Sequence, residues 1–178
     1  MVRKDRRRTA GLAAVVTLTL AAVLGLGVAA TAGQDGVSAA RAATARYNST
    51  VQAERAGYGP FPAGVPLAEC IMALDGTAGM GFHWLNPNLL DGQLDPTKPE
   101  VLVYAPRQNG KLQLVALEYV VFDDAWAGSG DPTLFGRTLT KVEAPNRYAI
   151  PTFWQVHLWL YEPNSSGLFA DFNPSVSC

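Results

Sequence analysis

The sequence predicts an α+β domain in which an N-terminal helix packs on a curved antiparallel β-sheet or partial barrel, closed by one disulfide. Apolar residues recur at helical spacing in one long segment, residues 38–56. After Cys70 they recur at every second position instead, which is typical of strands. The pair Asn109-Gly110 between two such stretches indicates a hairpin. Hairpin-connected strands that follow a single helix favour the α+β class.

The N-terminus has the layout of an export signal. Residues 3–8 hold five basic side chains and one acidic one, and residues 9–34 carry no charge. A basic region followed by an apolar one is typical of a secretory signal, and Ala30-Thr31-Ala32 predicts cleavage after Ala32. The alternative is an uncleaved membrane anchor, since roughly 20 apolar residues span a bilayer. We interpret residues 1–32 as a signal peptide or, alternatively, an anchor, and expect the rest to be secreted or extracytoplasmic.

The charge of the exported part excludes one class of partner. Residues 1–32 contain five of the 14 basic residues and one of the 15 acidic residues. Nine basic and 14 acidic residues remain, which gives a formal charge near −5. Because a nucleic-acid partner requires a basic surface, we expect none. We expect contact with a membrane only through the N-terminal segment, if it is uncleaved.

The two cysteines predict one disulfide. Cys70 and Cys178 both lie in the exported part, and an oxidising compartment favours their pairing. A loop of about 100 residues closed in this way contributes about 4–5 kcal/mol in the chain-entropy treatment. We expect residues 33–37 to be a short tether and residues 38–178 to form a single globular domain, which is long enough to bury a core.

The helix is expected from Ser38 to Ala56. Its apolar positions share one helical face: Ala40, Ala43, Tyr47 and Val51. Ser38 is expected as the N-cap and Gly57 as the residue that ends the helix, and prolines follow at positions 60 and 62.

Four strands are expected after the helix. They are Met80–Leu85, Val101–Ala105, Leu112–Phe122 and Thr152–Tyr161. The stretch from Leu112 to Phe122 is apolar at successive positions, so we expect it in the middle of the sheet with both faces covered. Long loops are expected at residues 86–98 and 123–150.

Three ionisable side chains lie inside predicted strands among large apolar residues: His83, Glu118 and His157. A carboxylate in a buried strand is costly unless a neighbour compensates it. Two histidines and a carboxylate suit zinc or iron, and a glutamate beside a histidine suits acid–base chemistry. The alternative is that these groups satisfy one another in a purely structural hydrogen-bond network with Tyr104, Tyr119 and backbone groups.

The candidate site follows from these three residues. For a ligand-binding pocket we expect His83, Glu118 and His157 together with Tyr104 and Trp159. The cofactor that this pattern indicates is a divalent metal on the two histidines and Glu118. No catalytic residue is assigned, because no Gly-x-Ser-x-Gly, phosphate-binding loop or free cysteine is present. The Asx-rich residues 86–95 lack the ligand order of an EF-hand and are interpreted as turns.

Short motifs are spread over almost the whole exported part. They are Met80-Gly81-Phe82-His83, Glu118-Tyr119, Leu134-Phe135-Gly136, His157-Leu158-Trp159 and the tail from Asn173-Pro174 to Cys178. In these motifs the chain resembles a family of exported bacterial proteins that has no known activity. The resemblance implies export and the extent of the domain, and it implies no reaction.

Three functions are therefore expected from the sequence. The first is an exported domain that binds a small molecule in an aromatic pocket. The second is a metal-dependent or acid–base enzyme that uses His83, Glu118 and His157. The third is a structural interaction domain of the cell envelope, whose partner is an envelope component. Metal analysis of the purified domain distinguishes the second from the others.

Overall fold

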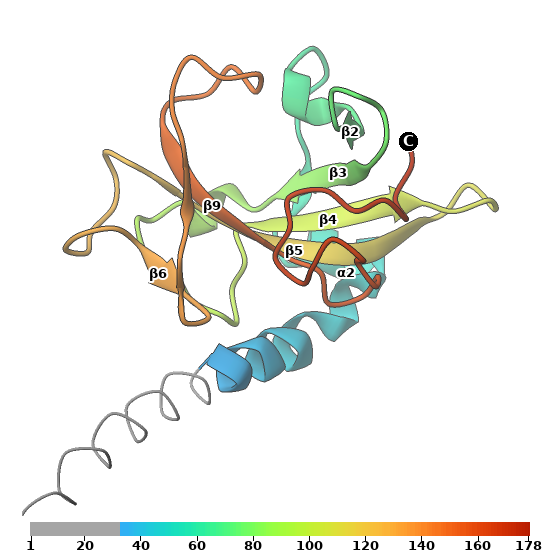
Figure 1. The fold of residues 1–178 in the computed structure, drawn as a ribbon. Helices are drawn as coiled ribbons and strands as arrows, with labels where there is room; N and C mark the ends of the chain where they lie inside the picture. Colours follow the sequence, from blue (N-terminus) through green and yellow to red (C-terminus); the bar gives the residue numbers. More distant parts are fainter. Residues whose placement is uncertain (1–32) are drawn as a thin grey trace, which may run out of the picture.

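An antiparallel sheet forms the centre of the protein, whose structure, a computed structural model, describes residues 33–178. Within these residues seven strands pair in the order β1-β3-β4-β5-β9-β8, and β2 also pairs with β3. The bounds are β1 Gly59–Pro60, β2 Ile71–Met72, β3 Gly79–Leu85, β4 Val101–Pro106, β5 Leu112–Phe122, β8 Thr140–Val142 and β9 Phe153–Leu158. A separate hairpin comprises β6 Thr133–Leu134 and β7 Arg137–Thr138. The predicted α+β class is confirmed, and this sheet does not close into a barrel (Figure 1).

The predicted strands agree closely with the observed ones. The longest, β5, has the predicted bounds and lies between β4 and β9, which confirms its central position. The hairpin between β4 and β5 turns where it was expected, and the Asn109 side chain accepts a hydrogen bond from the Lys111 N–H at 3.0 Å. The last strand ends at Leu158, three residues earlier than predicted, because the Trp159 N–H then bonds to the Leu168 carbonyl in the C-terminal tail.

The N-terminal helix differs from the prediction at its start and in its middle. Residues 33–37, expected as a tether, are already helical, so Ser38 is not the N-cap. The reason is tertiary packing: Val37 packs against the core under the sheet, which a flexible tether would not do. The expected signal segment and its cleavage after Ala32 lie outside the described residues. No helix within residues 33–178 has the length and apolar character to cross a bilayer.

The expected continuous helix is interrupted. The α-helix of residues 33–44 passes into the 3₁₀ turn η1 Ala45–Asn48, and α2 Thr50–Arg55 follows. Ser49 between them is extended, so the helical face shifts and Val51 is 51% exposed instead of buried. Gly57 ends α2 as predicted, with a φ of +94° and with the Tyr58 N–H donating to the Ala53 carbonyl at 3.0 Å.

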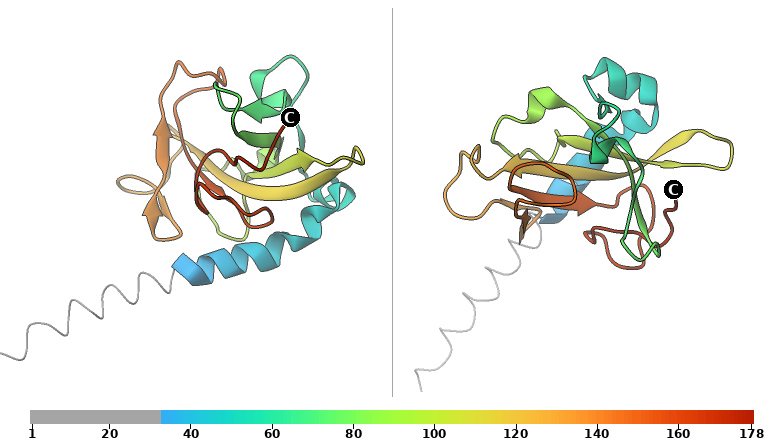
Figure 2. Two further views of the ribbon diagram at one scale, coloured as in Figure 1. Left: turned by 45° about the vertical axis from the view of Figure 1, so that its right-hand side comes forward. Right: turned by 90° about the horizontal axis from the view of Figure 1, so that it is seen from above.

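The sheet is covered on both faces, and one hydrophobic core lies on each face (Figure 2). The core on the helix side includes Tyr47, Leu102, Tyr104, Leu117, Tyr119 and Leu158. The core on the opposite side includes Val101, Val103, Ala116, Val120, Phe153, Trp159 and Val176. Loops cover this second side: the segment with η2 Pro66–Ala68, the connection from β8 to β9, and the C-terminal tail.

Two long connections pack in part against the core on the helix side, through Leu89 and Leu94 in the first and Leu134 and Leu139 in the second. The expected loop at 86–98 contains η3 Pro87–Leu89. The expected loop at 123–150 contains the β6–β7 hairpin and the edge strand β8, whose three residues are too few and too polar to show alternation.

The predicted disulfide is confirmed: Cys70 and Cys178 are bonded with a Cα–Cα distance of 5.7 Å, which fixes the C-terminus to the chain just before β2.

Candidate functional site: a buried histidine–glutamate–histidine cluster

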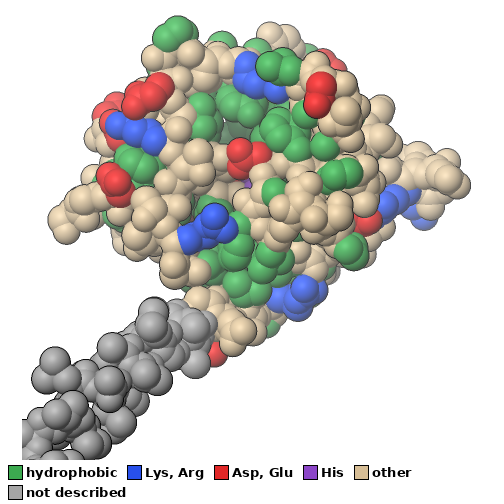
Figure 3. All heavy atoms as spheres, in the orientation of Figure 1, with side chains coloured by type: hydrophobic (Ala, Val, Ile, Leu, Met, Phe, Trp, Pro, Cys, Tyr) green, Lys and Arg blue, Asp and Glu red, His purple; other side chains and the backbone are tan. Residues whose placement is uncertain are grey.

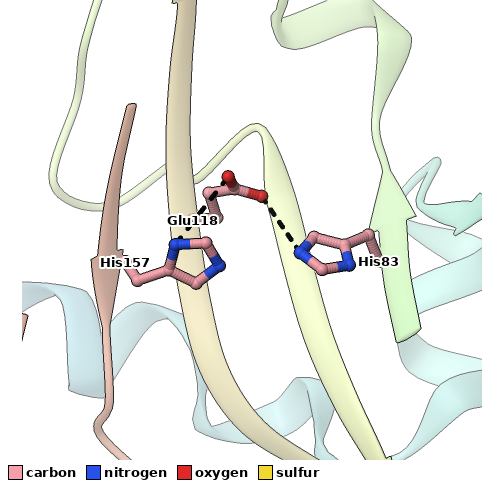
Figure 4. A group of neighbouring side chains, drawn as sticks. All are labelled: His83, Glu118 and His157. Atoms are coloured by element: carbon pink, nitrogen blue, oxygen red, sulfur yellow. Dashed lines mark ion pairs between the residues drawn. The ribbon is translucent and has the colours of Figure 1, made fainter. Parts of the chain in front are cut away.

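The strand register brings His83, Glu118 and His157 together (Figure 4). Glu118 on β5 lies directly opposite His157 on β9. His83 on β3 pairs with Val103 on β4, and Val101 on the same strand pairs with Glu118. Since side chains two residues apart on a strand share a face, all three point away from the helix. One ligand atom from each residue lies within 4.8 Å of the others.

The contacts inside the cluster are short. His83 Nε2 lies 3.4 Å from Glu118 Oε2, and His157 Nδ1 lies 3.9 Å from Glu118 Oε1. The two imidazole rings stand edge to face, with centroids 5.8 Å apart. Glu118 therefore lies between two histidines that almost touch each other.

Burial keeps the cluster uncharged near neutral pH. Loss of hydration lowers the pKa of His83 to about 3, helped by the neighbouring His157, and lowers the pKa of His157 to about 3. Loss of hydration also raises the pKa of Glu118 to about 8, with smaller contributions from Asp171 and Glu100. Between these values both imidazoles are neutral and Glu118 is protonated.

A hydrogen-bonded chain behind His157 determines its tautomer. The Gln155 amide donates from Nε2 to the Asp171 carboxylate at 3.0 Å, so its oxygen faces the other way. That oxygen lies 3.1 Å from His157 Nδ1, which must then carry the proton and donate. The lone pair of His157 is consequently on Nε2. This nitrogen and His83 Nδ1 are buried and have no hydrogen-bond partner in the described part of the chain.

A pocket opens onto the cluster. Its volume is about 70 Å³, and His83 and Glu118 form its polar end. The remaining lining residues are hydrophobic: Phe61, Leu67, Met80, Leu85, Leu90, Val101, Val120, Phe122, Tyr148, Ile150 and Phe153. In the space-filling view this face is hollowed, hydrophobic side chains border the hollow, and part of a histidine is visible (Figure 3).

His157 belongs to the cluster but does not line the pocket, and two further residues expected in the pocket are elsewhere. Tyr104 lies on the helix side, where its hydroxyl donates to the Tyr47 carbonyl at 2.6 Å. It follows Val103, whose side chain takes the cluster face, so alternation turns Tyr104 away. Trp159 stacks on His157 with centroids 6.3 Å apart and donates to the Ala170 carbonyl, and it is not among the residues that line the pocket.

Tyr104 and Tyr119, expected in the alternative structural network, do not take part in it. The Tyr119 hydroxyl donates to the Pro96 carbonyl at 2.7 Å on the helix side, as Tyr104 does to Tyr47. Neither tyrosine reaches a histidine, because both side chains lie on the other face of the sheet. The partner of His157 is Gln155 instead.

Sequence reasoning missed several residues of the site. The strand pattern indicates that Gln155 lies on the same face as His157, because the two residues are two positions apart. Nothing in the sequence indicates that Asp171 bonds to Gln155. Glu100, a buried carboxyl outside the cluster, was also missed: it is 2% exposed, accepts the Val120 N–H at 2.9 Å, and burial raises its pKa to about 8. Loop residues such as Phe61 and Tyr148 reach the pocket only through tertiary packing.

Comparison of the chain with protein-family models, with curated proteins and with solved structures finds no match. The resemblance to a family of exported bacterial proteins stays a prediction.

Proposed function

We propose that this domain binds a small, uncharged molecule in the pocket that opens onto His83 and Glu118. The observation that carries the proposal is the composition of the pocket: eleven hydrophobic side chains enclose it, and two ionisable side chains form one end. Ligand sites are typically apolar concavities with a few converging polar groups, and this pocket has that construction.

The lining favours an uncharged ligand. A charged group placed among the hydrophobic walls would lose its hydration without an opposite charge to replace it. An alcohol, amide or carbonyl group, in contrast, can hydrogen-bond to His83 Nε2 and to the Glu118 carboxyl at the polar end. The ligand is thus an apolar body with one neutral polar group.

The volume limits the buried part of the ligand. A cavity of about 70 Å³ is roughly half of the ~150 Å³ apolar cavity that accepts benzene. It accommodates a few heavy atoms, and a longer ligand would extend through the open side. The segment that precedes Cys70 contributes Phe61 and Leu67 to the wall of the pocket, and the Cys70–Cys178 disulfide holds the end of this segment. Because disulfides persist outside the cytoplasm, the bond supports a role there.

The proposal is tested with three probes that share a branched four-carbon body: isobutanol, isobutyrate and isobutylammonium. We expect isobutanol alone to produce saturable shifts in the imidazole resonances of His83. The variant Leu67→Trp should fill the pocket and abolish them, whereas Leu74→Trp, at a position 92% exposed, should leave them intact. Equal shifts from all three probes, or none from isobutanol, would overturn the proposal.

We also propose that the domain is exported by residues 1–32 and released by cleavage. The disulfide and the negative charge of the remainder support this location. Mass spectrometry of the protein from the expressing cell should give a mature N-terminus at Gly33. The structural envelope role expected as a third alternative stays a prediction.

A further inference from the structure

The donor atoms of the cluster have the spacing of metal ligands. Metal–ligand bonds of about 2.0–2.2 Å at tetrahedral angles place ligand atoms roughly 3.3–3.6 Å apart. His83 Nε2 and Glu118 Oε2 are 3.4 Å apart, and one donor from each of the three residues lies within 4.8 Å of the others. The His157 atom that lies 3.9 Å from Glu118 is Nδ1, so the His157 ring would have to move for Nε2 to join His83 Nε2 and Glu118 Oε2 on one ion.

The unpartnered nitrogen of His157 is the independent observation that points to a ligand. Gln155 fixes the proton on Nδ1, so Nε2 presents a lone pair in a buried space where no group of residues 33–178 donates to it. Figure 4 shows this nitrogen on the side of the ring that faces His83. Histidines that bind metals commonly donate their other N–H to an oxygen in this way, and the Gln155–Asp171 pair supplies that support.

We propose that His83, Glu118 and His157 form a site for one divalent transition-metal ion. Metal binding would displace the proton that Glu118 carries near neutral pH, and the resulting two neutral imidazoles and one carboxylate suit zinc or iron(II) and do not suit calcium, which prefers oxygen ligands. The three ligands stand on β3, β5 and β9 of the central sheet, with β4 between β3 and β5, and the sheet holds them in place.

The pocket leaves one coordination position open. His83 and Glu118 line it, so the ion would be accessible from that side to water or to a small neutral ligand. Three protein ligands with one open position are typical of catalytic zinc sites. The metal site does not depend on the proposed pocket ligand, because its ligand atoms are all side-chain atoms of this chain.

The test is titration of the chelator-treated protein with Zn²⁺ by calorimetry, and with Co²⁺ by visible absorption. We expect one ion per chain and the intense absorption of four-coordinate Co²⁺. His83→Gln and His157→Gln should each lower the affinity by more than the roughly 10–100-fold that loss of an outer-shell partner costs. Near-ultraviolet circular dichroism verifies that both variants are folded.

Glu100→Gln is the matched control for Glu118→Gln. Both carboxyls are buried and their pKa values are raised to about 8, but Glu100 is outside the cluster and bonds to the Val120 N–H. Glu118→Gln should weaken Zn²⁺ binding and Glu100→Gln should not. No binding by the wild type, or unchanged affinity in folded His83→Gln and His157→Gln, would overturn the metal site.

The two proposals fail separately. Leu67→Trp blocks the pocket and does not alter a ligand atom, so it should retain one Zn²⁺ per chain while losing isobutanol. A wild-type protein that binds isobutanol but does not bind Zn²⁺ would support the pocket and contradict the metal site. A wild-type protein that binds Zn²⁺ but does not bind isobutanol would support the metal site and contradict the pocket.

Discussion

Glu118 and His157 are direct cross-strand partners in β5 and β9, yet His157 Nδ1 bonds to Gln155 at 3.1 Å and stands 3.9 Å from the glutamate. The histidine is thus held from its own strand by a residue two positions earlier. This leaves the Glu118 carboxyl directed to the pocket and to His83, and it leaves Nε2 of His157 without a hydrogen-bond partner among the described residues. The predictions below follow from this arrangement and from the fold around it.

Removing the Gln155 amide should change the tautomer of His157. In Gln155→Leu the acceptor for the Nδ1 proton is lost, so the proton can move to Nε2, and ¹⁵N chemical shifts of the imidazole should report the change. We expect Zn²⁺ affinity to fall by about 10–100-fold. Gln113→Leu, the same substitution on β5 at a residue that bonds to Arg107, should alter neither quantity. An unchanged His157 spectrum in Gln155→Leu would contradict the assignment of the tautomer.

The metal-free protein should be most stable in mildly acidic solution. Burial lowers the pKa of His83 and His157 from 6.5 to about 3, so their contribution to stability is present above pH 6.5 and is lost as pH falls toward 3. Burial raises the pKa of Glu100 and Glu118 from 4.5 to about 8. The contribution of these two glutamates to stability is therefore present below pH 4.5 and is lost as pH rises toward 8. The two effects cancel between pH 4.5 and 6.5.

Urea denaturation with a chelator present measures this profile. At up to about 1.4 kcal/mol per group and pH unit, the two glutamates should lower the free energy of unfolding by about 2 kcal/mol from pH 6.5 to 7.5. Glu118→Gln removes one of the two groups and should roughly halve that decrease. A wild-type profile that is flat from pH 6.5 to 7.5 would argue against two buried, protonated glutamates.

Loss of the disulfide should affect both stability and the pocket. The bond joins residues 108 positions apart, and removing it in Cys70→Ser/Cys178→Ser should lower the free energy of unfolding by about 2–5 kcal/mol. The segment before Cys70 carries Phe61 and Leu67, so hydrogen exchange there should accelerate and isobutanol should bind more weakly. Exchange in the β4–β5 hairpin, which the bond does not restrain, serves as the internal control. Equal isobutanol affinity in the wild type and in Cys70→Ser/Cys178→Ser would show that the pocket wall keeps its structure without the disulfide.

Gly81, two residues before His83, should not tolerate a side chain. Its φ is +112°, and a Cβ there would collide with the Tyr104 carbonyl on β4. Gly110 also has a positive φ, of +74°, but has open space around it, so Gly110→Ala isolates the backbone strain of about 1–2 kcal/mol. Gly81→Ala should cost clearly more than Gly110→Ala in the same denaturation experiment. Equal losses would mean that β3 and β4 can separate without penalty.

Much of the fold was predictable because its signals are local. Alternation predicted most of β3 and β4 and all of β9, a continuous apolar run predicted β5, and Asn109-Gly110 predicted the turn that joins β4 to β5. The start of the helix was not predictable, because Gly33 to Val37 have weak helical preference and become helical where Val37 packs on the core. Strand β8 was missed for a similar reason, since its three residues are ordered by pairing with β9.

The sequence by itself determined which residues are candidates for a site, namely two histidines and Glu118 in the middle of apolar strands, and that the two cysteines pair with each other. Only the tertiary structure decided how these residues are supported. It placed Tyr104 behind the sheet, connected Asp171 through Gln155 to His157, and built the pocket wall from Phe61 and other loop residues. The physical reason is that spacing along one strand determines the face of a side chain, whereas strand register and loop packing determine its neighbours.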